Sequence, residues 1–161
     1  MKNARGILTA IVIFLIISWF VSLVFYPAKA ETRWVMCKSY INVRETPGSK
    51  AGGRLDAGDD FETEGKARDG YIKALGIGEA GIGWVFKGYT VTEKPVEVNE
   101  RFVCVARSRV ACRRWVDGPR IKGKAGWLYN GTNVKVYWRT SEWSLTSRGY
   151  IRSEWLEADP E

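Results

Sequence analysis

The chain has 161 residues, enough for one ordinary domain or two very small ones. It carries 25 lysines and arginines against 18 aspartates and glutamates, a net charge of +7, and it contains no histidine. The absence of histidine removes the commonest general base and the commonest side-chain metal ligand. Three cysteines are too few and too scattered for a zinc site made of cysteine alone. We therefore expect no enzymatic activity, no cofactor and no metal.

Residues 1–30 predict a membrane anchor or a signal peptide. Residues 7–26 form an uncharged run behind Lys2 and Arg5. At ~1.5 Å per residue a helix of this length reaches about 30 Å, enough to cross the hydrocarbon core. The length favours a retained single-pass anchor, whereas the Ala-x-Ala ending of residues 27–30 is typical of signal cleavage near Ala30. Both alternatives place the rest of the chain outside the cell membrane.

Short apolar runs separated by glycines follow from residue 31, and none keeps a helical period. Residues 61–64 alternate with a period of two, which places the phenylalanine and threonine inward and both glutamates outward. The Asp69-Gly70 dipeptide predicts a tight hairpin turn. The polar stretch 39–53, which contains Pro47-Gly48, predicts an ordered loop. The pattern indicates an all-β fold.

The plan of residues 31–94 recurs, more divergently, in residues 101–161 after a polar linker at 95–100. The recurring landmarks are residues 41–44 with 110–113, residues 53–58 with 126–131, and residues 83–85 with 149–151. We predict that residues 33–92 and 101–157 form two β-barrels with one strand order.

Several landmarks of the first copy resemble the signature of the bacterial Src-homology-3-type domain, a small β-barrel common in exported bacterial proteins. They are Asn42-Val43-Arg44, Pro47 and, forty residues later, Gly83-Trp84-Val85. The resemblance implies two tandem Src-homology-3-like barrels behind one N-terminal hydrophobic helix. The second copy keeps the signature arginine as Arg113 but replaces the asparagine by alanine. We expect Arg44 and Arg113 to pin a long loop by hydrogen bonds to backbone carbonyls.

The resemblance also implies a ligand groove lined by aromatic side chains beside the long loop and the closing strand. Carried over by position, the groove residues are Tyr40, Tyr71, Trp84 and Tyr89 in the first copy, and Tyr137, Trp143, Tyr150 and Trp155 in the second. Flat rings suit sugars and extended peptides. The other interpretation is that Trp84 and Trp155 only close the barrels. The aromatic residues expected to fill the cores are Trp34, Phe61, Phe86, Trp127 and Trp138.

Charge separates the two copies. Residues 31–94 hold ten basic and ten acidic side chains, whereas residues 101–152 hold twelve basic and two acidic ones. Aligning the copies places Lys135, Tyr137 and Arg139 on one outward strand face. Such an imbalance is typical of a surface that meets an anionic partner, although a solvated basic surface is the simpler alternative.

Export would place the cysteines where disulfides persist. Cys104 and Cys112 are the candidate pair, with buried free thiols as the alternative.

The favoured function is that of a non-catalytic, exported module that recognises cell-wall or envelope material, either a peptidoglycan peptide or an anionic wall polymer. The alternative is an envelope assembly or scaffold protein whose barrels bind extended protein segments. The expected partners are peptidoglycan or an anionic envelope polymer, the membrane through the N-terminal segment, and an envelope protein. Charge and aromatic rings would also suit single-stranded nucleic acid. Export argues against that, so no nucleic acid is expected.

Overall fold

The computed structural model describes residues 30–77 and 81–159, so the predicted membrane segment lies outside the described residues. In the part that is described, no helix is long and apolar enough to cross a membrane. This part is all-β, as the sequence predicts, with fourteen strands and three 3₁₀ turns of three residues each.

Residues 31–91 form what we call the first unit, a single antiparallel sheet in the order β3-β2-β6-β5-β4-β1-β7. Its elements are β1 (Glu31–Val35), β2 (Tyr40–Arg44), β3 (Ala51–Asp56), β4 (Asp60–Arg68), β5 (Tyr71–Leu75), β6 (Ile82–Phe86), the 3₁₀ turn η1 (Lys87–Tyr89) and β7 (Thr90–Val91).

Residues 96–158 form the second unit, with a five-stranded sheet β13-β12-β11-β8-β14 and a two-stranded sheet β10-β9. Its elements are β8 (Val96–Cys104), β9 (Arg109–Ala111), η2 (Lys124–Gly126), β10 (Trp127–Tyr129), β11 (Asn133–Arg139), β12 (Trp143–Thr146), β13 (Gly149–Arg152), η3 (Ser153–Trp155) and β14 (Leu156–Ala158). Arg113, two residues after β9, forms a bridge with Tyr150 of β13, at the place where the first unit pairs β2 with β6. The two units therefore share one strand order.

Strand register agrees with the sequence repeat. Asn42 pairs with Arg54 in the first unit, and Ala111 pairs with Trp127 in the second, as the alignment predicts. Equivalent turns also repeat their hydrogen bonds. The Gly58 N–H donates to the Val35 carbonyl at 2.9 Å, and the Gly131 N–H donates to the Cys104 carbonyl at 2.8 Å. Both glycines have a positive φ, which favours a residue without a side chain at that corner.

Each unit has its own apolar core. The first contains Val35, Ile41, Val43, Phe61, Ile72 and Val85, and the second contains Phe102, Leu128, Val134, Val136, Ile151 and Leu156. The inward positions predicted from the alternation at 61–64 are confirmed, because Phe61 and Thr63 are buried. Period-two patterning thus sets which face of each strand enters the core.

The structure confirms one predicted turn and corrects two predicted loop segments. The Asp69-Gly70 turn is confirmed: both residues have positive φ, at 52° and 81°, between the paired strands β4 and β5. The stretch 39–53 is not one loop, because β2 and the start of β3 occupy it and leave only residues 45–50 between them. The predicted linker 95–100 lies almost entirely within β8, whose backbone pairs with β11.

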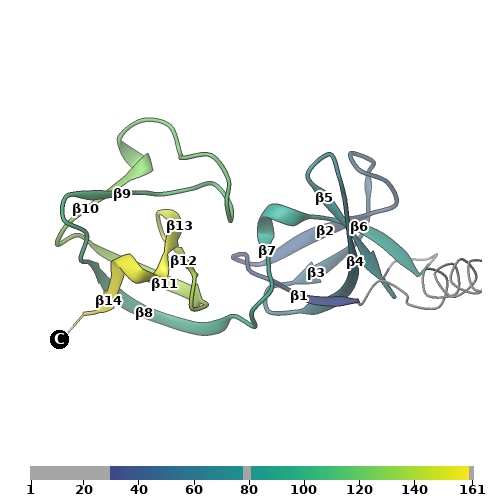
Figure 1. The fold of residues 1–161 in the computed structure, drawn as a ribbon, viewed down its shortest axis with the longest axis horizontal. Helices are drawn as coiled ribbons and strands as arrows, with labels where there is room; N and C mark the ends of the chain where they lie inside the picture. Colours follow the sequence, from purple (N-terminus) through teal and green to yellow (C-terminus); the bar gives the residue numbers. More distant parts are fainter. Residues whose placement is uncertain (1–29, 78–80, 160–161) are drawn as a thin grey trace, which may run out of the picture.

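The two units lie side by side (Figure 1), and a third apolar cluster joins them. Met36 and Val91 come from the first unit, and Trp143, Leu145 and Tyr150 come from the second. The Tyr150 hydroxyl donates a hydrogen bond to the Met36 carbonyl. The loop between β9 and β10 contacts η1 of the first unit, where the Val116 N–H donates to the Gly88 carbonyl at 2.9 Å.

Candidate functional site

The aromatic groove expected in the second copy is not an open groove. Trp143 and Tyr150 are only 2% and 3% exposed, because the first unit covers them. Burial raises the pKa of the Tyr150 hydroxyl well above its ordinary value. The prediction that these two residues line an exposed groove in a separate barrel is therefore wrong. It treated the copies as independent, whereas the docked first unit occupies that face.

The corresponding residues of the first unit keep more contact with solvent. Tyr71 and Trp84 are half-buried on β5 and β6, where the Tyr71 ring meets the Phe86 ring edge-on at 5.6 Å. Tyr89 is stacked on Tyr150 at 6.3 Å and so belongs to the contact between the units.

Two further groove candidates lie on the outside. Tyr40 is 51% exposed, with the Arg54 guanidinium 5.7 Å from its ring, and Trp155 in η3 is exposed. The structure therefore spreads the eight predicted groove residues over several surfaces and does not bring them together.

The aromatic residues expected to fill the cores lie in several different places. Phe61 is in the first core, and Trp34 and Trp138 are half-buried against the cluster between the units. Phe86 meets the Trp115 ring of the second unit at 5.3 Å. The core prediction is wrong for Trp127, which is half-buried on β10 beside two guanidinium groups.

The two signature arginines make equivalent contacts. Arg44 donates to the carbonyl of Ser49, and Arg113 donates to the carbonyl of Gly118 at 2.6 Å, in both cases five residues farther along the chain. These are the contacts expected of loop-pinning arginines. The other signature residues lie nearby in the first unit: Asn42 is exposed on β2, and Pro47 is half-buried in the loop that follows.

The predicted stripe of Lys135, Tyr137 and Arg139 is corrected at its last member. The strand pairing shifts by a residue between Val136 and Trp138, so alternation does not carry through. The Arg139 guanidinium lies 4.8 Å from the Phe102 ring and donates to two backbone carbonyls, of Ser153 and Leu156, at 3.1 Å each. Arg139 thus stabilises the fold of the second unit.

Lys38 of the first unit, and not Arg139, is the second cation beside Tyr137. Lys38 of the first unit and Lys135 of the second lie 5.1 and 5.6 Å from the centre of the Tyr137 ring. Ammonium groups at this distance are attracted to the electron-rich face of an aromatic ring. Tyr137 therefore lies among cations supplied by both units.

A larger group of cations, which we call the cationic surface, lies on β9 and the loop that leads to β10. Its exposed members are Arg109, Arg114, Arg120, Lys122 and Lys124. Two of them contact the half-buried Trp127, with the Arg109 and Arg120 guanidinium groups 4.1 and 4.6 Å from the ring centre. The first unit's counterpart, residues 45–50, contains one glutamate and one lysine.

Ion pairs do not neutralise the second unit. Within residues 30–77 and 81–159, the only one of its twelve cations in a salt bridge is Arg152, which contacts Asp117 at 3.5 Å and also Glu142. Strands β8 and β14 and the turn η3 add Glu97, Glu100, Glu154 and Glu157 to the unit, so its whole excess is smaller than residues 101–152 suggest. The cationic surface holds five of the eleven cations of the second unit that have no salt bridge within the described residues.

The cysteines form no disulfide. Cys37, Cys104 and Cys112 are all buried free thiols, so the predicted Cys104–Cys112 bridge is wrong. Burial raises the pKa of the Cys112 thiol to about 11 and also raises that of Cys37. Thiols held protonated in this way are poor nucleophiles.

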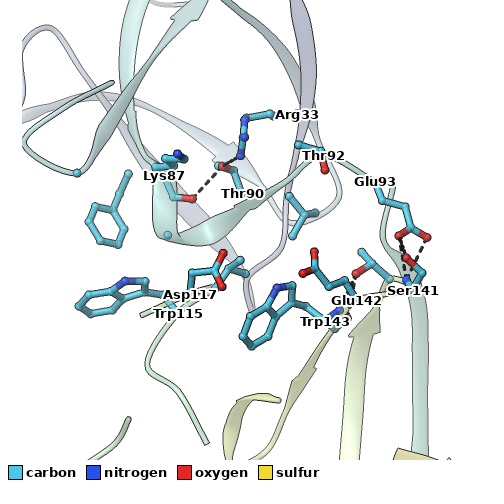
Figure 2. A pocket seen from close by; sticks show the side chains of 16 residues that line it. Arg33, Lys87, Thr90, Thr92, Glu93, Trp115, Asp117, Ser141, Glu142 and Trp143 are labelled. Atoms are coloured by element: carbon cyan, nitrogen blue, oxygen red, sulfur yellow. Dashed lines mark hydrogen bonds between the residues drawn. The ribbon is translucent and has the colours of Figure 1, made fainter. Parts of the chain in front are cut away.

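A cleft of about 670 Å³ lies between the units (Figure 2). The first unit contributes Arg33, Phe86 and Lys87, and the second contributes Trp115, Asp117, Glu142 and Trp143. No sequence pattern marks this region, because its residues belong to segments that are far apart in the chain. Nowhere in the described ranges do three or more carboxylate and cysteine side chains gather in a way that could hold a metal ion.

Thr140 and a serine pair support one wall of this cleft. The Thr140 hydroxyl accepts a hydrogen bond from the Trp143 N–H at 2.9 Å, and its carbonyl accepts one from the Ser153 hydroxyl, also at 2.9 Å. The hydroxyls of Ser144 and Ser153 are 2.8 Å apart in the same buried network. Buried and satisfied hydrogen bonds of this kind fix the backbone at Trp143.

Comparison with known proteins gives no family. No family model matches the chain, and no curated protein matches it. Among solved structures, NlpC2 from Trichomonas vaginalis is 10% identical over 82% of this chain and 49% of that one, with a TM-score of 0.34. NlpC1 from Trichomonas vaginalis is 11% identical over 84% and 48%, also with a TM-score of 0.34. The chain spans about half the length of these structures, and likeness at this level decides neither its fold nor its function.

Proposed function

We propose that the chain is an exported, non-catalytic binding module with two Src-homology-3-like barrels, and that it binds an anionic polymer of the cell wall or envelope. The shared strand order and the equivalent contacts of Arg44 and Arg113 support the barrel assignment. The module is held at the outer face of the membrane by residues 7–26, or released by cleavage near Ala30.

The observation that carries the proposal is the cationic surface. Five exposed cations on β9 and one loop have no carboxylate partner in the portion of the chain described, and two of them flank the Trp127 ring. Like charges held together repel one another in the free protein, and a polyanion relieves that repulsion. The planar guanidinium also matches the oxygens of phosphate and carboxylate groups.

The test is binding of the full-length chain, solubilised in detergent, to purified and nuclease-treated cell walls. We expect binding to intact walls and to vesicles of anionic phospholipid, and loss of wall binding once the phosphate-containing polymers are extracted. Full retention on extracted walls would contradict the proposal and point to a peptidoglycan peptide or glycan.

A charge-matched pair of variants tests whether the cationic surface is the part of the protein that binds the wall. Arg114→Glu with Lys122→Glu and Lys124→Glu changes three exposed cations of the cationic surface, none of which makes a side-chain hydrogen bond within residues 30–77 and 81–159. The control makes the same change of net charge at three exposed positions of the first unit, Lys50, Lys66 and Arg68. The first variant should lose most wall binding and the control little. Equal losses would mean that net charge alone attracts the chain.

A further inference from the structure

The second unit repeats the surface by which the first unit docks. In the first unit the Met36 N–H donates to the Tyr89 carbonyl at 2.9 Å, and both residues belong to the contact between the units. In the second unit the Val105 N–H donates to the Trp155 carbonyl at 3.1 Å, so these two residues take the places of Met36 and Tyr89. We call this part of the second unit the open surface; its residues are Val105, Arg107, Glu154, Trp155 and Glu157.

The open surface is uncovered within a single chain. Val105 and Trp155 are each 36% exposed, whereas Met36 is fully buried in the cluster between the units. Figure 1 shows β14, which follows Trp155, on the side of the second unit away from the first. The surface that covers Met36 in the first unit therefore indicates what kind of surface would cover Val105 and Trp155.

The first unit carries a face equivalent to that covering surface. Strands β5 and β6 correspond to β12 and β13, whose outward side chains contact the first unit. Besides Phe86, which meets Trp115, the outward residues of β5 and β6 are Tyr71, Lys73, Leu75, Ile82 and Trp84. None of these five is buried, and four of them are apolar or aromatic. We call them the β5–β6 face, and an uncovered sheet face of this composition favours contact with another protein surface.

The aromatic contact between the units has a counterpart on these two surfaces. Within the chain, the Tyr89 ring stacks on the Tyr150 ring with the ring centres 6.3 Å apart. The residues at the equivalent places are Trp155 of the open surface and Trp84 of the β5–β6 face. Two tryptophans in these places would bury at least as much aromatic surface as the two tyrosines do.

A contact between a cation and a ring becomes a pair of opposite charges. The Lys38 ammonium group of the first unit lies 5.1 Å from the centre of the Tyr137 ring. Counted from the equivalent hydrogen bonds and strand shifts, the counterparts of Lys38 and Tyr137 are Arg107 and Glu64. Arg107 makes no salt bridge within residues 30–77 and 81–159. Glu64 contacts Lys66 at 2.6 Å and can accept a second cation.

A second opposite pair replaces an apolar one. Val91 and Leu145 both belong to the cluster between the units. By strand pairing, the counterpart of Val91 is Glu157, and the counterpart of Leu145 is Lys73. Opposite charges in two separate places favour one orientation of the two surfaces.

The sizes of two further residues are exchanged. A Cβ on Gly88 would come within 2.4 Å of the Trp115 ring, so the contact within the chain requires a glycine here. The counterparts of Gly88 and Trp115, counted from Trp155 and from the signature arginines, are Glu154 and Thr46. A small side chain thus faces the larger one in both cases, which leaves room for Glu154.

We propose that the open surface docks onto the β5–β6 face of a second molecule of this chain, so that chains associate head to tail. Because the two surfaces differ, each added chain leaves one of each uncovered and the assembly can grow. Pro47 stands where the contact within the chain has Val116, and it has no N–H to donate, so the contact between chains is the weaker one. The cationic surface takes no part, and the association is therefore independent of polymer binding.

A pair of charge-exchange variants tests the contact. Sedimentation velocity follows the full-length chain in detergent, without wall material, and we expect its association to have a Kd of about 10 µM. Arg107→Glu and Glu64→Arg each bring like charges together, and each should weaken association about tenfold or more. An equal mixture of the two variants should associate like the parent chain, because every contact between unlike variants again pairs opposite charges.

The apolar part of the open surface has its own test. Trp155→Ala removes the largest side chain of that surface and should weaken association about tenfold. Tyr40→Ala is the control, because this ring is 51% exposed and belongs to neither surface, and it should leave association unchanged.

A chain that stays monomeric up to about 100 µM would overturn the proposal. Charge variants that associate as the parent does would also overturn it, because detergent or the N-terminal segments would then join the chains. Failure of the mixture to recover association is a third contradicting result. If Glu64→Arg does not fold, Lys73→Glu and Glu157→Lys provide a second exchange pair with the same expectation.

Discussion

The same strand positions serve different purposes in the two units. Tyr71 and Trp84 of the first unit correspond, by strand pairing, to Trp143 and Tyr150 of the second. The first pair is half-buried at the surface of its own sheet, whereas the second pair is buried under Met36 and Val91 of the other unit. A repeated fold can therefore turn one copy's exposed aromatic face into the contact that joins the copies.

The largest expected effect comes from shortening a side chain at the contact between the two units. Trp143→Ala should lower the free energy of unfolding by about 3 to 5 kcal/mol, because it empties the centre of the cluster between the units. Tyr71→Ala is the matched change in the first unit and should cost less than half as much, since this ring is only half-buried. Denaturant unfolding followed by tryptophan fluorescence measures both, and equal losses would contradict the comparison.

The two faces of β11 provide the next test. Arg139→Glu should cost about 2 to 4 kcal/mol, because it places a carboxylate against the carbonyls of Ser153 and Leu156 and removes the contact with Phe102. Lys135→Glu, at an exposed position of the same strand, should change stability by no more than about 0.5 kcal/mol. Thermal unfolding of the two variants distinguishes them. A stable Arg139→Glu protein would restore the three-residue stripe that the sequence predicts.

The hydrogen bond from Tyr150 to Met36 is a smaller contribution to the same contact. Tyr150→Phe leaves the Met36 carbonyl without this donor and should cost about 1 to 3 kcal/mol at neutral pH. Denaturant unfolding at pH 7 measures the loss. A cost close to zero would mean that the hydroxyl does not help to join the units.

Alkaline pH gives a separate expectation. Burial raises the pKa of both Tyr150 and Cys112, so the native state keeps protons that the unfolded chain releases. The unfolded chain then binds fewer protons, and stability falls as pH rises from about 9 through 11, while it is unaffected below that window. In Tyr150→Phe the decline above about pH 10 should be shallower than in the parent chain. Parallel curves would contradict the assigned burial.

Repetition and alternation made part of this structure predictable. The landmarks around Asn42 and Ala111 gave the correct strand register, because glycine turns and period-two patterning constrain strands locally. The same reasoning failed at Arg139, since one shift in strand pairing turns the later side chains to a different face.

The docking of the units was beyond sequence reasoning. It depends on the fit between distant segments, such as Trp115 against Gly88, and no local pattern records that fit. The inter-unit cleft and the burial of Trp143 follow from docking, so they were missed together. The sequence itself shows that cations accumulate in residues 109–124. Only the structure shows that Arg139 is not part of that group, because its guanidinium binds the backbone of its own unit.

The most direct test of the account is the salt dependence of wall binding. The parent chain and the Arg114, Lys122 and Lys124 triple glutamate variant are compared between low and high salt. We predict that the logarithm of the parent's binding constant falls steeply with the logarithm of salt concentration, because cations of the cationic surface displace counterions from the polymer. The triple variant should bind weakly with a much shallower slope. Parent binding that ignores salt, or equal slopes for the two proteins, would contradict the claim that this surface supplies the affinity.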